Sequence, residues 1–234
     1  MAGLIDDMAE LFATYPIVGS FLVNIRLTFW AAIFAFVLGT ILAVMRVSPA
    51  PSLRWAGAAY VNLVRNTPLT LIILAASLGL WGQLDVILAR NEAGRVDIER
   101  NGFMLAVLGL AVYTAAFVCE SLRSGVNTVP AGQAEAARAI GLSFGQSMRM
   151  IILPQAVRGA IAPLGNTLIA LAKNSTVAVA AGVVQSSSIM QTMIEVRPDL
   201  MVAIFFVIAL GWVIIVLPIG LLATFLSRRL GVAR

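Results

Sequence analysis

Four consecutive polar residues, Lys173, Asn174, Ser175 and Thr176, lie inside a long apolar stretch of the chain. On insertion scales a lysine near the middle of a membrane-spanning helix costs roughly 2.5–3.5 kcal/mol, so its presence there needs an explanation. The group offers one cation, one amide and two hydroxyls, which can bind a polar solute. A lysine that pairs internally, or extends along its helix to water, explains Lys173 equally well. We predict the four as candidate substrate-binding residues, with both interpretations open.

Arg65 and Thr67 precede Pro68 in a second apolar stretch. Proline kinks a helix, and the backbone groups it frees must face protein or a water-lined cavity. We include Arg65 and Thr67 among the substrate-binding candidates, although a structural arginine at a bend is favoured over direct contact with cargo. Glu120 and Arg123, spaced i, i+3, are expected to pair with each other or with the polar segment that follows them.

The chain lacks the residues that most enzymes and metal sites need. It contains no histidine and one cysteine, Cys119, so the commonest metal ligand and general base is absent. Its only lysine follows Ala172 in an apolar stretch, and no Gly-x-x-x-x-Gly-Lys-Ser/Thr phosphate-binding loop is present. We therefore predict no catalytic residue, no cofactor and no metal in this chain, and energy supplied by another protein.

Membrane-spanning helices must position these polar groups. Hydrophobic residues make up 60% of the 234 residues and charged residues 12%, whereas soluble domains have about 25% charged residues. A helix of about 20 residues crosses the bilayer core, and five apolar stretches are long enough, at 18–46, 56–82, 103–126, 160–184 and 199–226. We predict an all-α, polytopic membrane helix bundle with five transmembrane helices and a single transmembrane domain, 1–234.

The distribution of arginines indicates the orientation of these helices, because Lys and Arg near helix ends are retained in the cytoplasm. With the N-terminus outside, the inside ends and loops contain Arg46, Arg54, Arg123, Arg138, Arg149, Arg158, Arg228, Arg229 and Arg234. The outside loops then have more acidic than basic residues. We predict N-out and C-in, and we attribute the net charge of +5 to this topology rather than to nucleic-acid binding. Membrane lipids are the expected surroundings.

The segment 126–156 is too polar to span a bilayer and patterned as two short helices. Pro130 suits a first helical turn, the residues after it favour helix, and Gly141 supplies a left-handed stop. Ser143 and Gln146 form the pattern of a capping box at the start of the second helix. Pro154 is expected to bend or end that helix. Glycines elsewhere are expected to permit close helix crossing, namely Gly39, Gly79, Gly109, Gly165, Gly182 and Gly211.

Several motifs resemble one family of transport proteins. Gly132-Gln-Ala-Glu-Ala-Ala, then Gly141, then Ile152-Leu-Pro154 resembles the EAA signature of ABC importer permeases. The segments 60–69, 113–123 and 173–176 are similar to the second, third and fourth spans of polar amino acid permeases. Asn66 replaces the usual glycine of the second. The chain looks like a member of the histidine/glutamine/glutamate branch of type I ABC importers, and most like the actinobacterial glutamate permease subunits.

This resemblance implies a type I (MetI-like) permease fold with a cytoplasmic coupling helix, here in the segment 128–155, that lies in a groove of an ABC ATPase. Small side chains allow close seating in such a groove. The residues implied in ATPase coupling are Gly132, Gln133, Glu135, Ala136, Ala137, Arg138, Gly141, Leu153 and Pro154. The implied partners are two ABC ATPase subunits that use ATP and Mg, a second permease subunit, homologous or identical, and an extracytoplasmic solute-binding protein.

The implied cargo is a polar amino acid, glutamate or a close relative such as glutamine or aspartate, moved across the bacterial cytoplasmic membrane by alternating access. Related permeases commonly have Asp at the position of Asn174, where it lines the central substrate site. The change to Asn removes a negative charge, which is compatible with an anionic cargo. Lys173 is common in relatives of varied specificity, so it does not by itself select glutamate.

Two other functions fit the composition less well. An intramembrane enzyme would need a catalytic constellation, yet Glu120 is the one acid in the interior of a predicted span. A membrane scaffold that transports nothing would have no need of the polar group 173–176. ATP-dependent uptake by the reconstituted transporter would separate both from a permease.

Overall fold

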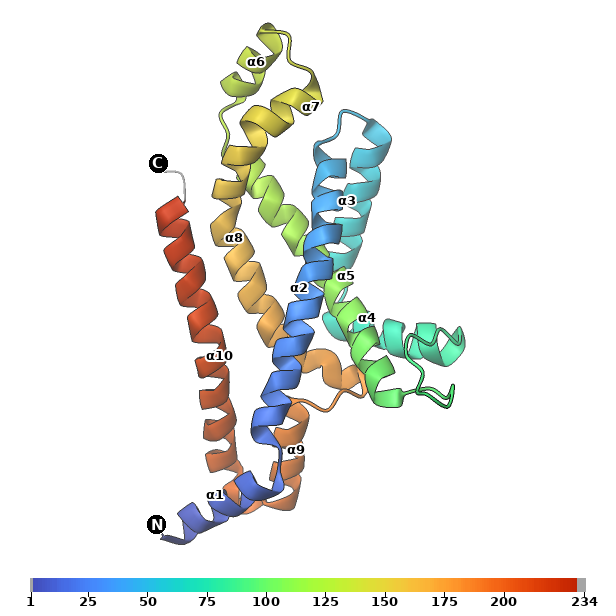
Figure 1. Cartoon of the computed structure of the whole chain (residues 1–234), viewed down its shortest axis with the longest axis vertical. Helices are drawn as coiled ribbons and strands as arrows, with labels where there is room; N and C mark the ends of the chain where they lie inside the picture. The colour runs from blue at the N-terminus through green and yellow to red at the C-terminus, as the bar shows by residue number, and fades with distance from the viewer. Residues whose placement is uncertain (1, 231–234) are drawn as a thin grey trace. The chain divides into compact units, whose positions relative to one another are not determined.

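The computed structural model describes residues 2–230, which are almost entirely helical and contain no strand (Figure 1). Three described helices are long and apolar enough to cross a membrane: α2 (Ile17–Val47), α5 (Ile98–Val126), and α10 (Met201–Leu230) together with the preceding turn η4 (Pro198–Leu200). Two further pairs of helices qualify if each bent pair counts as one span. The predicted number of five spans agrees with the larger count. The predicted N-out and C-in orientation stays a prediction.

The second predicted span, 56–82, is broken. It consists of α3 (Pro51–Arg65), α4 (Leu69–Leu74) and the π-helix η1 (Ala75–Gln83). Pro68 has no backbone N–H to donate to a carbonyl of α3, so the helical hydrogen bonds cannot continue there. Two side chains instead satisfy the last carbonyls of α3: Asn66 Nδ2 donates to Asn62 O over 2.8 Å, and Thr67 Oγ1 donates to Leu63 O over 2.9 Å. The interruption predicted at Pro68 is thus confirmed.

The fourth predicted span, 160–184, is also interrupted. The helix α8 (Leu153–Asn174) is followed by the 3-10 helix η3 (Ser175–Ala181), and Gly182, at φ 75°, ends it in the left-handed conformation. A further helix, α9 (Ser186–Val196), follows. Neither α9 nor the N-terminal helix α1 (Ala2–Thr14) was predicted. Both are too short to span a membrane, and their residues were assigned to segments outside the predicted spans.

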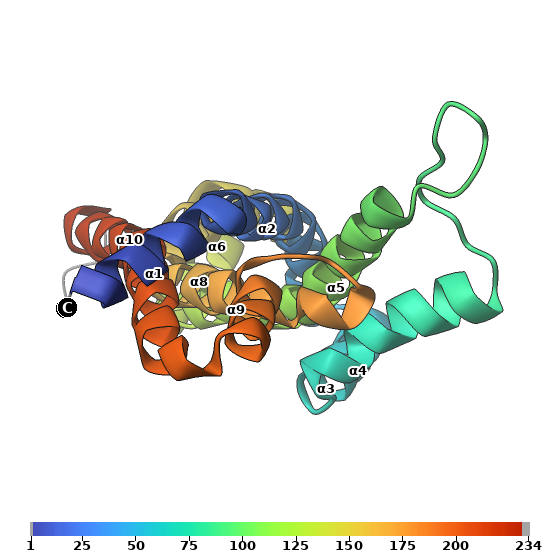
Figure 2. The same cartoon turned by 90° about the horizontal axis from the view of Figure 1, so that it is seen from below.

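The chain forms two compact units, and long helices contribute to both. The first unit contains residues 2–31, 68–110 and 171–217. Its core joins α1, the start of α2, α9 and the start of α10, whose packing Figure 2 shows from below. Leu11, Phe21, Met193 and Ile204 are buried there. Gly211 leaves room for the Phe21 ring, which also packs edge-on against Trp212.

The second unit contains residues 32–67, 111–170 and 218–230. Small residues bring its helices close together: a Cβ on Gly39 would lie 2.6 Å from Val118 Cβ, and one on Gly125 would meet Ala156 O. Among the glycines expected at helix crossings, Gly39, Gly109, Gly165 and Gly211 do lie against a neighbouring helix. A Cβ added to Gly79 or Gly182 would meet no neighbouring atom within 4 Å. The single domain 1–234 stays a prediction.

Candidate functional site

The four polar residues at 173–176 lie at the junction of α8 and η3, in different surroundings. Lys173 is exposed, and Asn174 and Thr176 are half-buried. Ser175 is fully buried. Successive side chains of a helix point in different directions. A solute can therefore approach Lys173, Asn174 and Thr176, but not the buried Ser175.

Lys173 and Thr176 line a hollow of about 560 Å³ whose other walls belong to α10. These walls are Trp212, Val213, Val216 and Leu217. The Thr176 hydroxyl donates to Lys173 O over 2.9 Å, which leaves its oxygen free to accept. Neither the Lys173 ammonium nor the Asn174 amide forms a hydrogen bond or ion pair with another residue among those the structure describes. The junction can therefore offer a cation, an amide and a hydroxyl to a small polar molecule.

Ser175 belongs instead to a buried polar network that sequence reasoning missed. Its hydroxyl donates to Ala172 O over 2.7 Å and accepts from Asn24 Nδ2 over 2.9 Å. Asn24, on α2, is 1% exposed, and its amide also donates to Gln185 Oε1 over 3.3 Å and accepts from the Ser186 N–H over 3.1 Å. The available signal was the one asparagine in the predicted span 18–46.

Gln185, completely buried, is the N-cap of α9. Its Oε1 accepts from the Ser187 N–H over 2.8 Å, and its Nε2 donates to Thr176 O over 2.9 Å and to Ser187 Oγ over 2.7 Å. Ser188 Oγ accepts from the Gln185 N–H over 2.8 Å, which completes a capping box. Gln185 thus joins the start of α9 directly to the candidate substrate residues.

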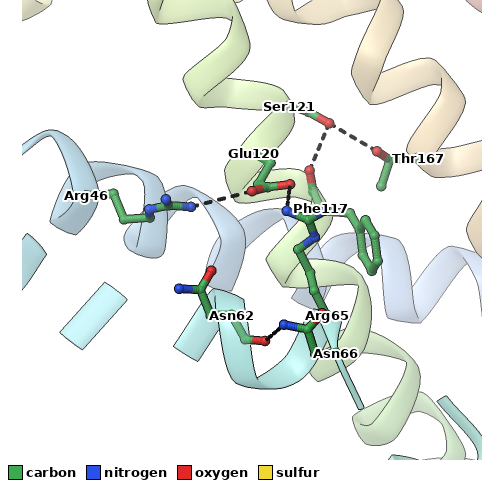
Figure 3. Close-up of polar contacts among 8 residues, drawn as sticks. All are labelled: Arg46, Asn62, Arg65, Asn66, Phe117, Glu120, Ser121 and Thr167. Atoms are coloured by element: carbon green, nitrogen blue, oxygen red, sulfur yellow. Dashed lines mark hydrogen bonds and ion pairs between the residues drawn. The ribbon is translucent and has the colours of Figure 1, made fainter. Parts of the chain in front are cut away.

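Arg65 and Thr67, the other substrate candidates, belong to the second unit. Arg65 Nη1 lies 2.6 Å from Glu120 Oε2, and its guanidinium lies over the Phe117 ring, 5.9 Å from the centroid (Figure 3). Thr67 uses its hydroxyl to cap α3. Arg65 is therefore held by an ion pair and an aromatic ring, yet its side chain remains 43% exposed.

The pairing expected for Glu120 was wrong. Glu120 does not pair with Arg123 among the described residues; its second oxygen faces Arg46 Nη1, 3.7 Å away on α2 (Figure 3). The i, i+3 spacing only permits a pair along α5, whereas two arginines from other helices reach the carboxylate. At the next position along α5, Ser121 Oγ lies 3.1 Å from Thr167 Oγ1 of α8. This cluster joins α2, α3, α5 and α8.

The polar segment forms the two expected helices, α6 (Ala131–Ala139) and α7 (Phe144–Ser147). Gly141 has φ 84°, and the capping box is present: the Ser143 N–H donates to Gln146 Oε1 over 2.9 Å, and the Gln146 N–H to Ser143 Oγ over 3.3 Å. Pro154 does not end the second helix. After α7 the helical hydrogen-bond pattern changes to that of the π-helix η2 (Met148–Ile152). The helix α8 then begins at Leu153 and continues through the proline.

The residues implied in ATPase coupling divide into an inner and an outer set. Gln133 accepts a hydrogen bond from Gln155 Nε2 on α8, and Ala137 is buried, so both hold α6 against the rest of the segment. The outer set is exposed and consists of Gly132, Glu135, Ala136, Arg138, Gly141, Leu153 and Pro154. Beside it lie two exposed apolar side chains, Ile140 at 76% and Phe144 at 52% exposure.

Sequence comparison places most of the chain in one family. Residues 35–232 match the family described as "Binding-protein-dependent transport system inner membrane component". The glutamate transport system permease protein GluC of Corynebacterium glutamicum is 52% identical over 92% of this chain and 94% of its own length. The probable glutamine ABC transporter permease protein GlnM of Bacillus subtilis is 36% identical over 84% of each chain.

Solved structures resemble the whole fold. A crystal structure of an amino acid ABC transporter with histidines contains a chain that superposes with a TM-score of 0.79, at 25% identity and 97% coverage of both chains. An inward-facing MetNI methionine ABC transporter gives a TM-score of 0.69 at 21% identity, covering 92% of this chain and 96% of that one. The second likeness concerns the fold alone.

Proposed function

The chain belongs to the family of binding-protein-dependent transport system inner membrane components and is a membrane-spanning permease subunit of an ABC transporter, and from that premise we propose that it imports glutamate. The 52% identity to a glutamate permease over nearly the full length of both chains carries the proposal. Glutamine or aspartate is the alternative cargo, because permeases named for glutamine and for glutamate/aspartate are 36% and 33% identical.

The geometry at 173–176 supports an anionic amino acid as the cargo that binds there. Lys173 supplies a positive charge beside the hollow, and Thr176 and Asn174 supply neutral donors and acceptors. None of the described residues that line the hollow has a carboxylate, so these side chains do not repel the carboxylate of glutamate. Arg65 stays a candidate for cargo contact through the part of its guanidinium that Glu120 does not occupy.

Transport in this proposal is driven by ATP hydrolysed on separate ATPase subunits, two per transporter, that dock on α6 and the turn after it. The exposed face of α6 is narrow because its side chains are small, and Ile140 and Phe144 add apolar surface beside it. Such a face suits a helix that lies in a groove of a partner. A second permease subunit and an extracytoplasmic binding protein complete the assembly.

Reconstitution tests the cargo. The chain, its second permease subunit where that differs, the ATPase and the binding protein are incorporated in liposomes, and uptake of labelled glutamate, glutamine, aspartate and arginine is followed with and without internal ATP. We expect ATP-dependent uptake that is fastest for glutamate. Faster uptake of another amino acid overturns the assignment of cargo, and uptake that does not depend on ATP overturns the mechanism.

The role of Asn174 is tested by the variant Asn174→Asp. A carboxylate beside Lys173 should shift the preference from glutamate toward arginine, because opposite charges attract in a site of low dielectric. Asn91→Asp is the matched control: Asn91 lies in an exposed turn, and its Oδ1 accepts from the Arg95 N–H, a bond that Asp retains. An unchanged preference in Asn174→Asp removes this residue from the site.

The docking of the ATPase is tested at Gly141. A β-branched residue is strained at φ 84°, so Gly141→Val should displace α6 from α7 and reduce co-purification of the ATPase. Gly94→Val introduces the same strain at φ 73° in another loop and is the control. An ATPase yield that falls equally in both variants, or in neither, contradicts docking at α6.

A further inference from the structure

We infer that Asn24 is a positioning residue for substrate selection, acting with Gln185 to hold the candidate site at 173–176 in place. The inference rests on the proposed function of this chain as an amino acid permease. Neither residue lines the hollow beside Lys173. Both act through the backbone and side chains of residues that do, or that lie next to them.

The Asn24 side-chain amide both donates and accepts hydrogen bonds. Its nitrogen donates to Ser175 Oγ and Gln185 Oε1, and its oxygen accepts from the Ser186 N–H. Asn24, Ser175, Gln185 and Ser186 are each 1% exposed or less. A buried polar group costs free energy unless it is paired. The four residues therefore have one satisfied arrangement, and that arrangement fixes where η3 begins relative to the start of α2.

The Gln185 side chain holds η3 by a hydrogen bond to the backbone of η3. Its Nε2 donates to Thr176 O, so the carbonyl of a hollow-lining residue is held by a fully buried side chain. The 3-10 helix η3 has seven residues, whereas such helices rarely exceed about four because their hydrogen bonds are poorer. Contacts from outside must then stabilise it, and the Asn24 and Gln185 amides supply them.

Packing around η3 agrees with this requirement. A Cβ on Gly102 of α5 would lie 2.8 Å from Ala181 O, so the last residue of η3 is against the α5 backbone. Ser175 at the start and Ala181 at the end are thereby both held, while Lys173 and Thr176 face the hollow. A shift of η3 would move the site residues without removing any of them.

A purely structural role for Asn24 would lower stability and leave selectivity alone, so selectivity is the decisive measurement. Asn24→Asp keeps the oxygen that accepts from Ser186 and removes both donated hydrogen bonds. Gln185→Glu keeps Oε1 and removes the N–H groups that donate to Thr176 O and Ser187 Oγ. Thr28→Val is the control, because the Thr28 hydroxyl is buried on the same helix and donates only to Asn24 O within α2.

The complete transporter in liposomes provides the readout: the ratio of uptake rates of the two amino acids that the wild type carries fastest, at saturating binding protein. A site displaced enough to lose one hydrogen bond to a charged cargo group, worth about 1.4 kcal/mol, should show a fall in this ratio of about tenfold. We expect it in Asn24→Asp, in Gln185→Glu and in the uncharged variant Ser175→Ala, because all three break bonds of one network. Thr28→Val should keep the wild-type ratio.

An unchanged ratio in the two variants, with only a lower unfolding temperature, overturns the inference, and so does an equal change in Thr28→Val. A fall in the two charged variants but not in Ser175→Ala also contradicts it, because the introduced carboxylates then explain the change. If Asn24→Asp does not assemble, Ser175→Ala removes one acceptor of the same amide without a change in charge and must lower the ratio. A wild type whose two best cargoes exclude glutamate overturns the proposed cargo and leaves this test intact.

Discussion

Two polar clusters lie among apolar helices in this protein, and they are built in opposite ways. In the first unit, Asn24, Ser175, Gln185 and Ser186 are neutral and completely buried, and their amides and hydroxyls bond to one another. In the second unit, the carboxylate of Glu120 lies between Arg65 and Arg46, and the side chains of Glu120 and Arg65 are 33% and 43% exposed.

The difference follows from the cost of removing charge from water. Neutral amides can be buried completely when every donor and acceptor is paired. Charged groups carry a far larger desolvation penalty, and in this cluster the side chains of Glu120 and Arg65 are left 33% and 43% uncovered by the rest of the chain. The neutral cluster can therefore set a geometry precisely, whereas the charged one holds helices together while remaining accessible to a solute.

The largest effect is expected from Glu120→Gln. The change leaves Arg46, 15% exposed at its side chain, and Arg65 beside each other without a counter-charge. A broken buried pair costs about 3–5 kcal/mol, and partial exposure reduces this to about 2–3 kcal/mol. Unfolding in mixed detergent micelles measures the loss. The double variant Arg65→Met with Glu120→Gln removes one of the two uncompensated charges and should recover part of it; no recovery would contradict the ion pair as the cause.

The next largest effects are expected at two glycines, one near each cluster. A Cβ on Gly39 would lie 2.6 Å from Val118, separating α2 from α5 near Glu120, and one on Gly102 would lie 2.8 Å from Ala181 O at the end of η3. Overpacking costs about 1–3 kcal/mol. We expect both Gly39→Ala and Gly102→Ala to lower stability, but only Gly102→Ala to change the ratio of cargo uptake rates. A change of ratio in Gly39→Ala as well would erase the distinction between the clusters.

The smallest effect is expected at an exposed ion pair of the first unit. Arg197 contacts Asp7 at 3.3 Å and Asp199 at 2.8 Å, and the Asp199 pair is bidentate. Exposed pairs contribute about 0–1 kcal/mol, so Asp7→Asn should lower the free energy of unfolding by less than about 0.5 kcal/mol and increased salt should mask it. A loss comparable to that in Glu120→Gln would show that exposure does not explain the difference between the clusters.

Hydropathy predicted much of the fold. The spans predicted at 18–46, 103–126 and 199–226 match α2, α5 and α10, because about 20 apolar residues in a row have few alternatives to a membrane helix. Pro68 predicted the break in the second span. The interruption of the fourth span at η3 was not predicted, because the polar group 173–176 was interpreted as a substrate site within a continuous span. The amides of Asn24 and Gln185, which bond to Ser175 and Thr176, lie outside that local pattern.

The candidate site was predicted in part. Lys173 and Thr176 line a hollow, but Ser175 does not face it, since its hydroxyl is bonded to Asn24. The substrate and coupling roles of the predicted residues stay predictions. Gln185 was missed altogether, because α9 was not predicted and nothing local links this glutamine to Thr176.

The sequence by itself determined the class of protein, the long apolar helices, the family and the helical pair at α6 and α7. The family follows from the motifs, and the helices depend on hydropathy and on hydrogen bonds between residues three or four apart, such as Ser143 with Gln146. The tertiary structure alone decided which arginines neutralise Glu120 and which polar residues are buried. Those choices join Asn24 to Ser175 and Gln185 across 151 and 161 residues, and pairing over such separations is fixed only when helices pack and water is excluded from between them.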